Sequence, residues 1–387
     1  MARRHRIGVI GFGRMGRGFV EDMLKSDVWE VVYICDGWEP SRTAARRMAP
    51  HATVIDNPDI IFKDKSLQVA GIFTLADVRP DLIRRALSAK LHIIAEKPLA
   101  ADPAVEWKLV KEIEASDRLV AVNIFNRNAW YHKDIIDFIQ SGELGELAIV
   151  RVCHMTPRPH AHRRYDPEGP PFHDCGMHYV DVARWYAGSD YATWHAQGVR
   201  MWNHTDPWWV QVHGTFKNGV VFDITQGFVY GHLAQQKTHN CYVDVIGTKG
   251  IARMRHDFKN ATVELHGVNQ TVHKTAPFGD KKLDVMINVF AKSLIAGKNL
   301  GFPVARDSVI ASQVSWAMLE DAVKNNPPAI GTQTEMQAIL EHRRNLRNGY
   351  GLPVRAEEQS CGTSHPIACG EEFCNVPKMP KRIDACA

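Results

Sequence analysis

A glycine-rich turn close to the amino terminus constrains the fold of this chain more than any other feature. The apolar run RIGVI leads into GFGRMG at residues 11–16, and an amphipathic segment follows directly. In a GxGxxG turn the first glycine permits the tight bend, the second lets a pyrophosphate approach the backbone, and the third lets the next helix pack closely on the strand. The N–H groups at the start of that helix then face the phosphate. We therefore expect a dinucleotide to contact Gly11, Phe12, Gly13, Arg14, Met15 and Gly16.

The segment around this turn alternates apolar runs with helical patterns. RIGVIG, EVVYICD, AGIFTL, LHIIAE and LVAVNIF are aliphatic runs with few polar breaks, which is typical of buried parallel strands. Helical patterns such as RPDLIRRALSAK and ADPAVEWKLVKEIEASD lie between them. This order predicts a doubly wound parallel sheet, a Rossmann fold, as an amino-terminal domain over residues 1–125.

The following part of the chain has a different pattern. Longer alternating runs, among them ELAIVRVCHM, WWVQVHGTF and GVVFDITQGF, predict a large, mostly antiparallel open sheet in a second α/β domain over residues 126–350. Asn218-Gly219 marks a hairpin turn, and we expect two late helices around 281–296 and 305–324. We expect residues 351–387 to form a Cys-rich tail with little regular structure.

Composition excludes several classes of function. The net charge of +4 over 387 residues, without a long Lys/Arg run, argues against nucleic acid as a partner. No apolar run approaches the roughly 20 residues that a membrane span needs. MARRHR leads straight into a strand pattern without a signal-peptide core, so we expect a cytoplasmic protein. Four of the eight cysteines crowd the tail; we favour incidental thiols there over a zinc site or disulfides.

Asp36 ends the second apolar run, 20 residues after Gly16. A carboxylate at this point accepts hydrogen bonds from the adenine ribose hydroxyls and repels the 2′-phosphate of NADP. The sequence therefore predicts NAD as the cofactor, with NADP as the less favoured alternative. A glycine-rich turn that binds nothing is the remaining alternative.

Glu96-Lys97-Pro98 follows the fifth apolar run. Ligands of open α/β sheets bind outside the carboxyl ends of the strands, so Lys97 can reach a reacting centre there. We expect Lys97 to share protons with a substrate hydroxyl and to contact the cofactor together with Glu96 and Thr74. The alternative is a surface lysine paired with Glu96.

Asp174, His178 and Asp181 are spaced at i, i+4 and i+7 within HDCGMHYVDVARWYAG. If this segment is a helix, the three side chains share a face, and Gly188 ends the helix. His178 could take the proton of a hydroxyl whose carbon gives up a hydride, and Asp174 could orient the ring or stabilise the imidazolium. The alternatives are a helix N-cap for Asp174 and a satisfied core histidine for His178.

The glycine turn, EKP at 96–98 and D-x-x-x-H-x-x-D at 174–181 together resemble the Gfo/Idh/MocA family, named for glucose–fructose oxidoreductase and inositol dehydrogenase. IGTKG at 246–250 adds to a resemblance that covers roughly residues 5–330. It implies a Rossmann domain followed by an open-sheet domain, a nicotinamide cofactor, sugar or polyol substrates, and Lys97 with His178 around the reacting carbon. It also implies subunit contact through the flat face of the second sheet, hence a homodimer or homotetramer.

One loop departs from the family pattern. Where the family shows T-P-x-x-x-H, this chain has Thr74-Leu75-Ala76-Asp77-Val78-Arg79, so the loop beside the nicotinamide is expected to differ.

A histidine-rich segment at 154–178 leaves three interpretations open. It can be a substrate loop, an exposed loop without a role, or a metal site built on His173, Asp174 and His178. The spacing matches no familiar metal motif, so we expect no metal. We expect the substrate to contact Arg127, Trp130, His173, Asp174 and His178.

These observations predict an NAD-dependent dehydrogenase that acts on a secondary CH–OH group of a sugar, sugar acid or cyclitol. A redox-neutral enzyme that cleaves glycosides or epimerises with tightly bound NAD is the first alternative. A non-catalytic NAD-binding sensor is the second.

Overall fold

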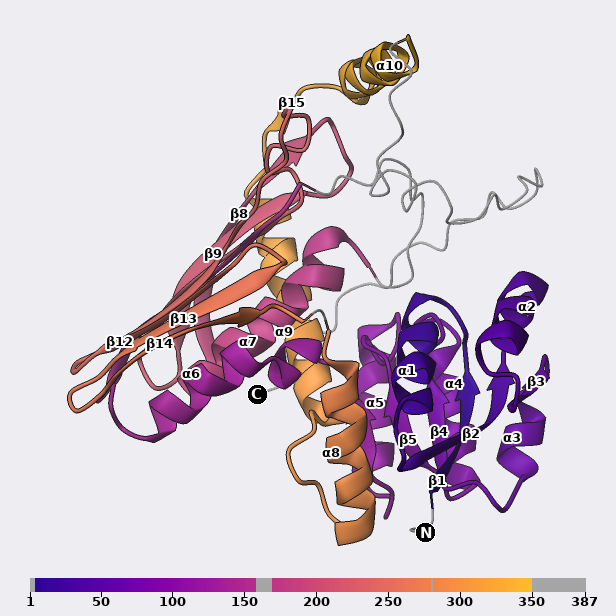
Figure 1. Ribbon diagram of the computed structural model, residues 1–387. Coiled ribbons are helices and arrows are strands. Elements are labelled where there is room, and N and C mark those ends of the chain that lie inside the picture. Colours follow the sequence, from indigo (N-terminus) through magenta and orange to yellow (C-terminus); the bar gives the residue numbers. More distant parts are fainter. Residues whose placement is uncertain (1–3, 158–168, 280, 350–387) are drawn as a thin grey trace. The chain divides into compact units, whose positions relative to one another are not determined.

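The computed structural model describes residues 4–157, 169–279 and 281–349. A six-stranded sheet begins the fold, in the order β3-β2-β1-β4-β5-β6, and every neighbouring pair in it is parallel (Figure 1). Its strands are β1 (His5–Ile10), β2 (Trp29–Cys35), β3 (Thr53–Ile55), β4 (Val69–Ile72), β5 (His92–Ala95) and β6 (Val120–Val122). The strand order reverses between β1 and β4, and the loops after these two strands hold the glycine turn and Thr74. This is the doubly wound sheet that the sequence predicts, because its aliphatic runs are buried on both faces.

Helices connect these strands as in other doubly wound sheets. They are α1 (Arg14–Leu24), α2 (Glu39–Met48), α3 (Asp59–Lys63), α4 (Arg79–Ser88) and α5 (Pro103–Glu114). The start of α5 shows why a helix begins there: the Asp102 side chain accepts a hydrogen bond from Ala104 N at 2.8 Å, and Pro103 occupies the first helical position.

A nine-stranded sheet follows, in the order β14-β13-β12-β11-β7-β10-β9-β8-β15. All neighbouring pairs are antiparallel except β10 with β7 and β15 with β8. The turn at 217–219 joins β9 to β10, and Gly219 takes a φ of 87°, as the hairpin signal predicts. The strands are β7 (Leu147–Met155), β8 (Tyr191–Met201), β9 (Trp209–Phe216), β10 (Val221–Gly227), β11 (Asn240–Gly247), β12 (Ile251–His256), β13 (Asn260–His266), β14 (Thr271–Pro277) and β15 (Ala329–Ile330).

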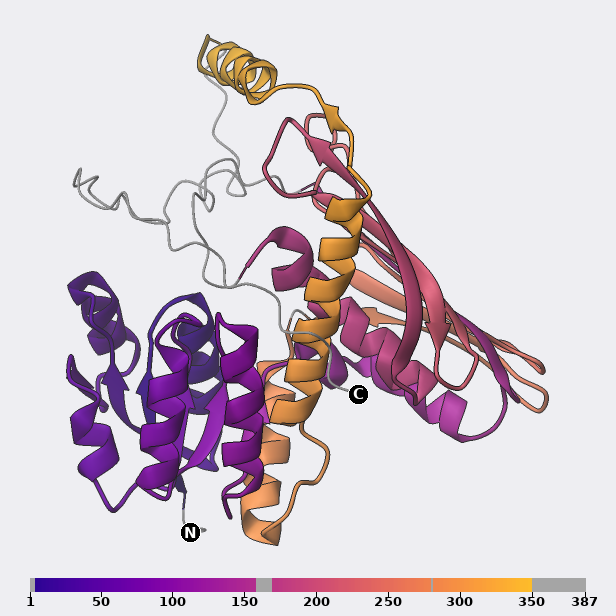
Figure 2. The same cartoon turned by 180° about the vertical axis from the view of Figure 1, so that it is seen from behind.

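Helices pack on this second sheet and link it to the first. The 3₁₀ turn η1 (Phe125–Asn128), α6 (Trp130–Gln140), the π-turn η2 (Phe172–Gly176) and α7 (Met177–Ala187) precede β8. The long helix α9 (Ala305–Lys324) lies along the sheet and contacts β8 (Figure 2). Its first turns join the apolar core beside β5 and β6 through Ala305 and Val309, whereas Met318 and Leu319 join the core of the second sheet. Helix α9 therefore packs on β6 of the first sheet and on α7 of the second layer.

Helix α8 (Leu283–Ala296) packs against α1, and its Phe290 ring stacks on Trp29 with centroids 6.5 Å apart. A last helix, α10, spans Gln333–Gly349. The predicted Cys-rich tail at 351–387 lies outside the described residues, and the domain limits at 125 and 350 stay predictions.

Candidate active site

The glycine turn has the geometry that a dinucleotide site needs. Gly11 has a φ of 91°, and a Cβ there would lie 2.7 Å from the Phe73 carbonyl. A Cβ at Gly16 would lie 2.0 Å from the carbonyl oxygen of Gly11, so helix α1 can approach β1 only with glycine at this position. A Cβ at Gly13, by contrast, would meet no atom within 4 Å. The turn thus keeps open space above the start of α1, as a pyrophosphate requires. The ring of Phe12 is fully buried, so only its backbone faces that space.

Asp36 stands beside the turn at the end of β2. Its carboxylate accepts hydrogen bonds from Phe12 N at 2.7 Å and from Trp38 N at 2.8 Å, one at each oxygen. Each carboxylate oxygen has a second lone pair, so the half-buried group can still accept from ribose hydroxyls. After β4, the buried Thr74 hydroxyl has no hydrogen-bond partner in the part of the chain that the structure describes. Both observations suit a bound NAD, which would supply hydroxyl and carbonyl groups to these atoms.

Arg79 replaces the histidine of the family pattern, and it is almost completely buried. Its guanidinium donates to the carbonyl oxygens of Thr74 and Pro98. It therefore ties the loop after β4 to the loop after β5. The loop differs from the family pattern as expected: a buried cation at position 79 joins the loops after two neighbouring strands, β4 and β5.

Lys97 follows β5 and meets Asp174 of η2. Its ammonium group donates to the Asp174 carboxylate and, at 2.9 Å, to the Asp174 carbonyl oxygen. Lys97 is only 9% exposed, whereas the Asp174 side chain is 43% exposed. The neighbouring Glu96 accepts from Asn123 Nδ2 at 2.6 Å, so it does not pair with Lys97 as the surface alternative requires. The Lys97–Pro98 peptide bond is cis.

His178 is the second residue of α7, buried against the ring of Phe125 with centroids 4.4 Å apart. Its Nδ1 has no hydrogen-bond partner within residues 4–157, 169–279 and 281–349. Burial, with the positive charges of Lys97 and Lys281, lowers its pKa well below the ordinary value, so the imidazole is neutral at pH 7.

Asp174 does not bond to this histidine. Burial alone would raise the pKa of its carboxyl, but the charge and hydrogen bond of Lys97 outweigh burial and lower it. The Asp174 carboxylate therefore orients Lys97. No hydrogen bond among the described residues supports its predicted action on the His178 imidazole.

A buried hydrogen-bonded chain lies behind these groups. Glu106 of α5 accepts from Leu99 N at 3.1 Å and from the Ser312 hydroxyl at 2.8 Å. The Ser312 oxygen is 2.9 Å from His173 Nε2, and the His173 ring packs on Trp316. His173, expected to contact substrate, is only 3% exposed. In this structure it joins the π-turn to α9 and α5, and its contact with substrate stays a prediction.

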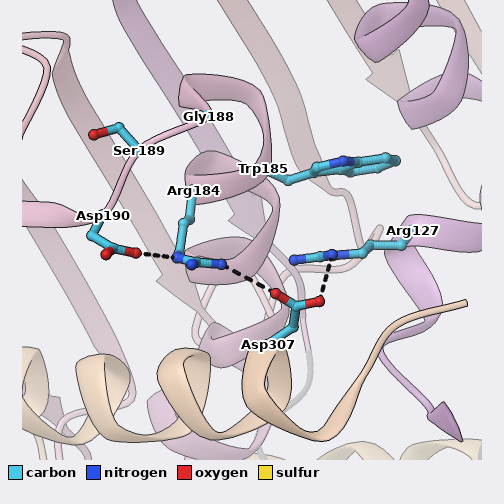
Figure 3. Close-up of a pocket in the computed structure, with 7 residues that line it drawn as sticks. All are labelled: Arg127, Arg184, Trp185, Gly188, Ser189, Asp190 and Asp307. Atoms are coloured by element: carbon cyan, nitrogen blue, oxygen red, sulfur yellow. Dashed lines mark hydrogen bonds and ion pairs between the residues drawn. The ribbon is translucent and has the colours of Figure 1, made fainter. Parts of the chain in front are cut away.

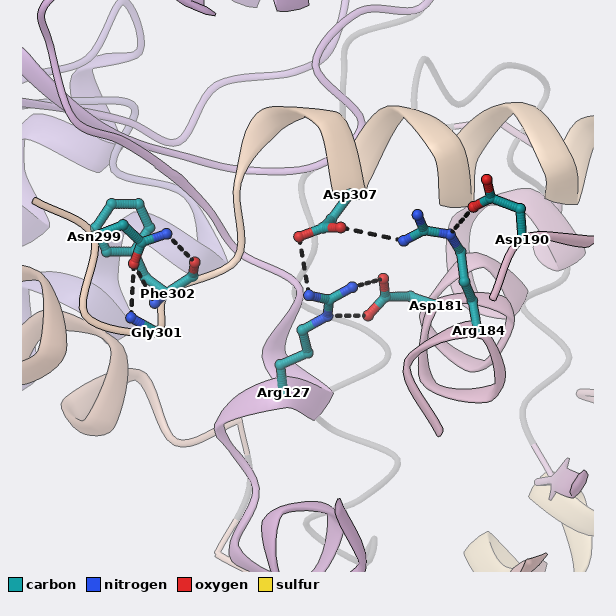
Figure 4. Close-up of polar contacts among 8 residues, drawn as sticks. All are labelled: Arg127, Asp181, Arg184, Asp190, Asn299, Gly301, Phe302 and Asp307. Carbon is teal, nitrogen blue, oxygen red and sulfur yellow. Dashed lines mark hydrogen bonds and ion pairs between the residues drawn. The ribbon is translucent and has the colours of Figure 1, made fainter. Parts of the chain in front are cut away.

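Arg127 and Asp181 anchor a second charged cluster (Figure 4). The guanidinium of Arg127 donates to both oxygens of the fully buried Asp181, at 2.8 and 2.7 Å, and to Asp307 at 2.9 Å. Arg184 connects Asp307 with Asp190 at 3.2 and 2.8 Å. Asp181, the last residue of the D-x-x-x-H-x-x-D motif, thus connects α7 through Arg127 to η1 and α9.

A pocket of about 350 Å³ opens beside this cluster (Figure 3). The cations in its wall are already paired with carboxylates, so an anion would have to displace them. A substrate contact of Arg127 remains a prediction. The lining residues are Arg127, Arg184, Trp185, Gly188, Ser189, Asp190 and Asp307.

The other predicted contacts have protein partners. Trp130 Nε1 donates to the Pro277 carbonyl at 3.0 Å, and the buried His154 stacks on Tyr179. Residues 158–168 of the histidine-rich segment lie outside the described residues. Within the described residues, no group of three or more His, Cys, Asp or Glu side chains could hold a metal ion.

Sequence reasoning missed several groups that surround Lys97. The sequence does mark Arg79 as unusual, because it stands where the family pattern has a histidine. Glu106 and Lys281 carry none, because each is a single charged residue on an ordinary helical or loop pattern. Their places depend on contacts between α5, α9 and the segment before α8.

Two family profiles match this architecture. The oxidoreductase family with an NAD-binding Rossmann fold matches residues 5–124, and the GFO/IDH/MocA C-terminal domain matches residues 132–253. The chain belongs to the Gfo/Idh/MocA family. The family confirms the predicted fold class, the NAD cofactor and the oxidoreductase class.

Individual members of the Gfo/Idh/MocA family are distant in sequence. An uncharacterized oxidoreductase of Bacillus subtilis is 24% identical over 266 residues, 65% of this chain and 74% of that protein. Myo-inositol 2-dehydrogenase of Thermotoga maritima is 23% identical over 252 residues, 63% of this chain and 73% of that enzyme.

Solved structures share the fold at similar distance. Levoglucosan dehydrogenase in complex with NADH gives a TM-score of 0.71 at 16% identity, over 83% of this chain and 98% of that one. Myo-inositol 2-dehydrogenase from Lactobacillus plantarum gives 0.70 at 17% identity, over 84% and 98%. Across the described ranges, no helix combines the length and apolarity that crossing a membrane requires.

Proposed function

We propose that this Gfo/Idh/MocA protein is an NAD-dependent dehydrogenase that oxidises a secondary hydroxyl of a sugar, sugar acid or cyclitol. One observation carries the proposal: the ammonium of Lys97, just after β5, is bound to Asp174, and its positive charge acts on the buried, neutral His178 of α7. A cationic donor and a neutral base in one place are the two groups that carbinol oxidation needs.

NAD, when bound, accepts the hydride from the carbinol carbon. The chain's own residues handle the oxygen and its proton. Neutral His178 takes the hydroxyl proton as the C=O bond forms. Lys97 donates a hydrogen bond to the same oxygen and stabilises its developing negative charge, while Asp174 holds the ammonium in position.

The substrate class is supported by two kinds of observation. Several relatives are named inositol 2-dehydrogenase, and one structural neighbour is a levoglucosan dehydrogenase. These compounds present several secondary hydroxyls on one small ring. Polar groups at the site, including Lys97 and His178, can bind such hydroxyls.

The test is to denature the purified protein, identify any nicotinamide nucleotide released, and then follow NADH formation with sugars, sugar acids and cyclitols. We expect little bound nucleotide and NAD reduction with at least one compound. Stoichiometric NAD that survives purification, with turnover that needs no added cofactor, would favour the redox-neutral alternative. No turnover, with an unchanged biological effect in Lys97→Ala, would favour the sensor.

We further propose a homodimer or homotetramer through the second sheet. Helices α6, α7 and α9 contact one side of this sheet, and alternate residues of β10 to β13 that face away from the buried core stay partly exposed. Mass photometry of the purified protein tests the proposal, and a monomer at all concentrations would contradict it.

A further inference from the structure

Lys281 brings a second ammonium group to the active site, from the segment just before α8. Its Nζ lies 3.1 Å from the sulfur of Met15 in the glycine turn and 5.3 Å from the centroid of the Phe125 ring. Phe125 is the ring that packs on His178. Lys281 therefore reaches the place where the cofactor turn, the 3₁₀ turn and the proposed base meet.

The charges around Lys281 are not balanced within the described residues. Arg14, Lys97, Glu96 and Asp174 are close enough to act on its pKa, yet among the described residues no carboxylate lies within 4.0 Å of its Nζ. The Asp174 carboxylate is bound to Lys97, and that of Glu96 to Asn123. Its contacts within the described residues are a thioether and a ring face, so this half-buried ammonium loses hydration there without gaining an ion pair from them.

We propose that Lys281 binds the carboxylate of the substrate, so that the enzyme acts on a polyhydroxy acid such as an aldonate or uronate rather than on a neutral sugar or cyclitol. The inference rests on the proposed function and narrows its substrate class. An anionic substrate would supply the missing countercharge, and a charge-assisted hydrogen bond to Lys281 would fix which hydroxyl lies against Lys97 and His178.

The position of Lys281 favours the substrate over the cofactor as the source of the anion. The cofactor's pyrophosphate has its own donors in the N–H groups at the start of α1. The charge of Lys281 acts instead on the groups that would surround the carbinol carbon, since it lowers the pKa values of both His178 and Asp174.

The test measures binding of D-gluconate and D-glucuronate, with D-glucitol, D-glucose and myo-inositol as neutral counterparts, to the full-length protein saturated with NADH. Isothermal titration calorimetry gives the affinities.

Lys281→Met keeps a side chain of similar length against Phe125, and Lys282→Met is the matched control. We expect at least one acid to bind more tightly than its neutral counterpart. We expect Lys281→Met to weaken the binding of that acid about 10- to 100-fold, with little change in the affinity for neutral compounds or NADH. Lys282→Met should leave all of these affinities almost unchanged.

Three results would overturn the inference. Neither acid binds, the neutral compounds bind at least as tightly as the acids, or Lys281→Met weakens the binding of NADH instead of the binding of the acid. Hydride transfer is scored separately. If an acid binds through Lys281 but no NADH forms from NAD with any compound, the dehydrogenase proposal fails and the anion site stands. If NADH forms from neutral compounds alone, the dehydrogenase stands and the acid preference fails.

Discussion

The buried carboxylate of Glu106 accepts a hydrogen bond from the backbone N–H of Leu99, two residues after Lys97. Its other oxygen accepts from the Ser312 hydroxyl, which in turn contacts His173, the residue before Asp174. One carboxylate in α5 therefore supports the backbone on both sides of the Lys97–Asp174 pair.

Glu106→Gln should change how stability depends on pH. Burial raises the pKa of Glu106 to about 7, from 4.5. Between these values the folded protein holds a proton that the unfolded chain releases, so the free energy of unfolding falls as pH rises from about 4.5 to 7. A shift of this size corresponds to about 3 kcal/mol. Urea unfolding at pH 5 and pH 8 should show wild type losing most of that free energy, about 2 to 3 kcal/mol, relative to Glu106→Gln. Glu114→Gln, at an exposed position on the same helix, is the control; parallel pH dependence in all three proteins would contradict the prediction.

Lys97→Ala should lower kcat far more than it lowers cofactor affinity. The lysine acts on the substrate oxygen, whereas the glycine turn and Asp36 hold most of the dinucleotide. Loss of such a proton-handling group costs about 10²–10⁴ in rate. Stopped-assay kinetics and NADH fluorescence titration measure the two effects, with the exposed Lys111→Ala as control. Unchanged kcat, or a loss of NADH binding as large as the loss of rate, would remove Lys97 from the role proposed here.

The pKa of His178 predicts the acid side of the pH–rate profile. Burial and nearby cations lower this pKa well below 6.5, so the ring stays neutral and able to accept a proton down to pH 6.5. Wild-type kcat/KM should show no loss attributable to His178 between pH 8 and pH 6.5. His178→Asn should lose about 10²–10⁴ in kcat. A decline in wild-type activity that begins above pH 6.5 and is absent from the variant's residual activity would argue against a neutral base.

Asp36 should control the choice between NAD and NADP. Asp36→Asn removes the charge that repels a 2′-phosphate but keeps one acceptor oxygen for the backbone N–H groups of Phe12 and Trp38. We expect the ratio of NADP to NAD affinity to rise at least about tenfold, in line with the loss of one close charge repulsion. Fluorescence titration with NADH and NADPH measures it. Equal changes for both cofactors would mean that the variant had only disturbed the turn.

The parallel sheet was predictable because local patterns report it directly. Buried strands give aliphatic runs, and the glycine turn has steric requirements at Gly11 and Gly16 that no other residue meets. The strands β3, β12, β14 and β15 were missed. β3 and β15 have three and two residues, β12 carries Arg253 and Arg255, and β14 is mostly exposed, so none of them shows a long apolar run.

The active site was predictable only as far as its motifs extend. EKP and D-x-x-x-H mark Lys97, Asp174 and His178, but spacing along the chain cannot say which of them bond to each other. Asp174 lies in the π-turn at 172–176 and bonds to Lys97, whereas the i, i+4 spacing of a regular α-helix would place it on one face with His178. Arg79, Glu106 and Lys281 reach the site through contacts between distant elements, which no local pattern records.

Arg127→Ala should destabilise the fold strongly, because it leaves the fully buried Asp181 without its partner. Burial already raises the pKa of Asp181, and Arg127 opposes that rise. Removing one side of a buried ion pair typically costs about 3–5 kcal/mol. The loss should shrink at acid pH, where Asp181 can take up a proton instead of holding an unpaired charge. Thermal and urea unfolding at pH 5 and pH 8 measure both effects.

Lys217→Ala, which removes an exposed partner of Asp190, is the control, and its free energy of unfolding should stay within about 0.5 kcal/mol of wild type. The double variant Arg127→Met/Asp181→Leu should recover much of the loss, since it removes both charges. If the double variant is as unstable as Arg127→Ala at both pH values, the cost lies in lost packing between η1, α7 and α9 and not in the unpaired carboxylate.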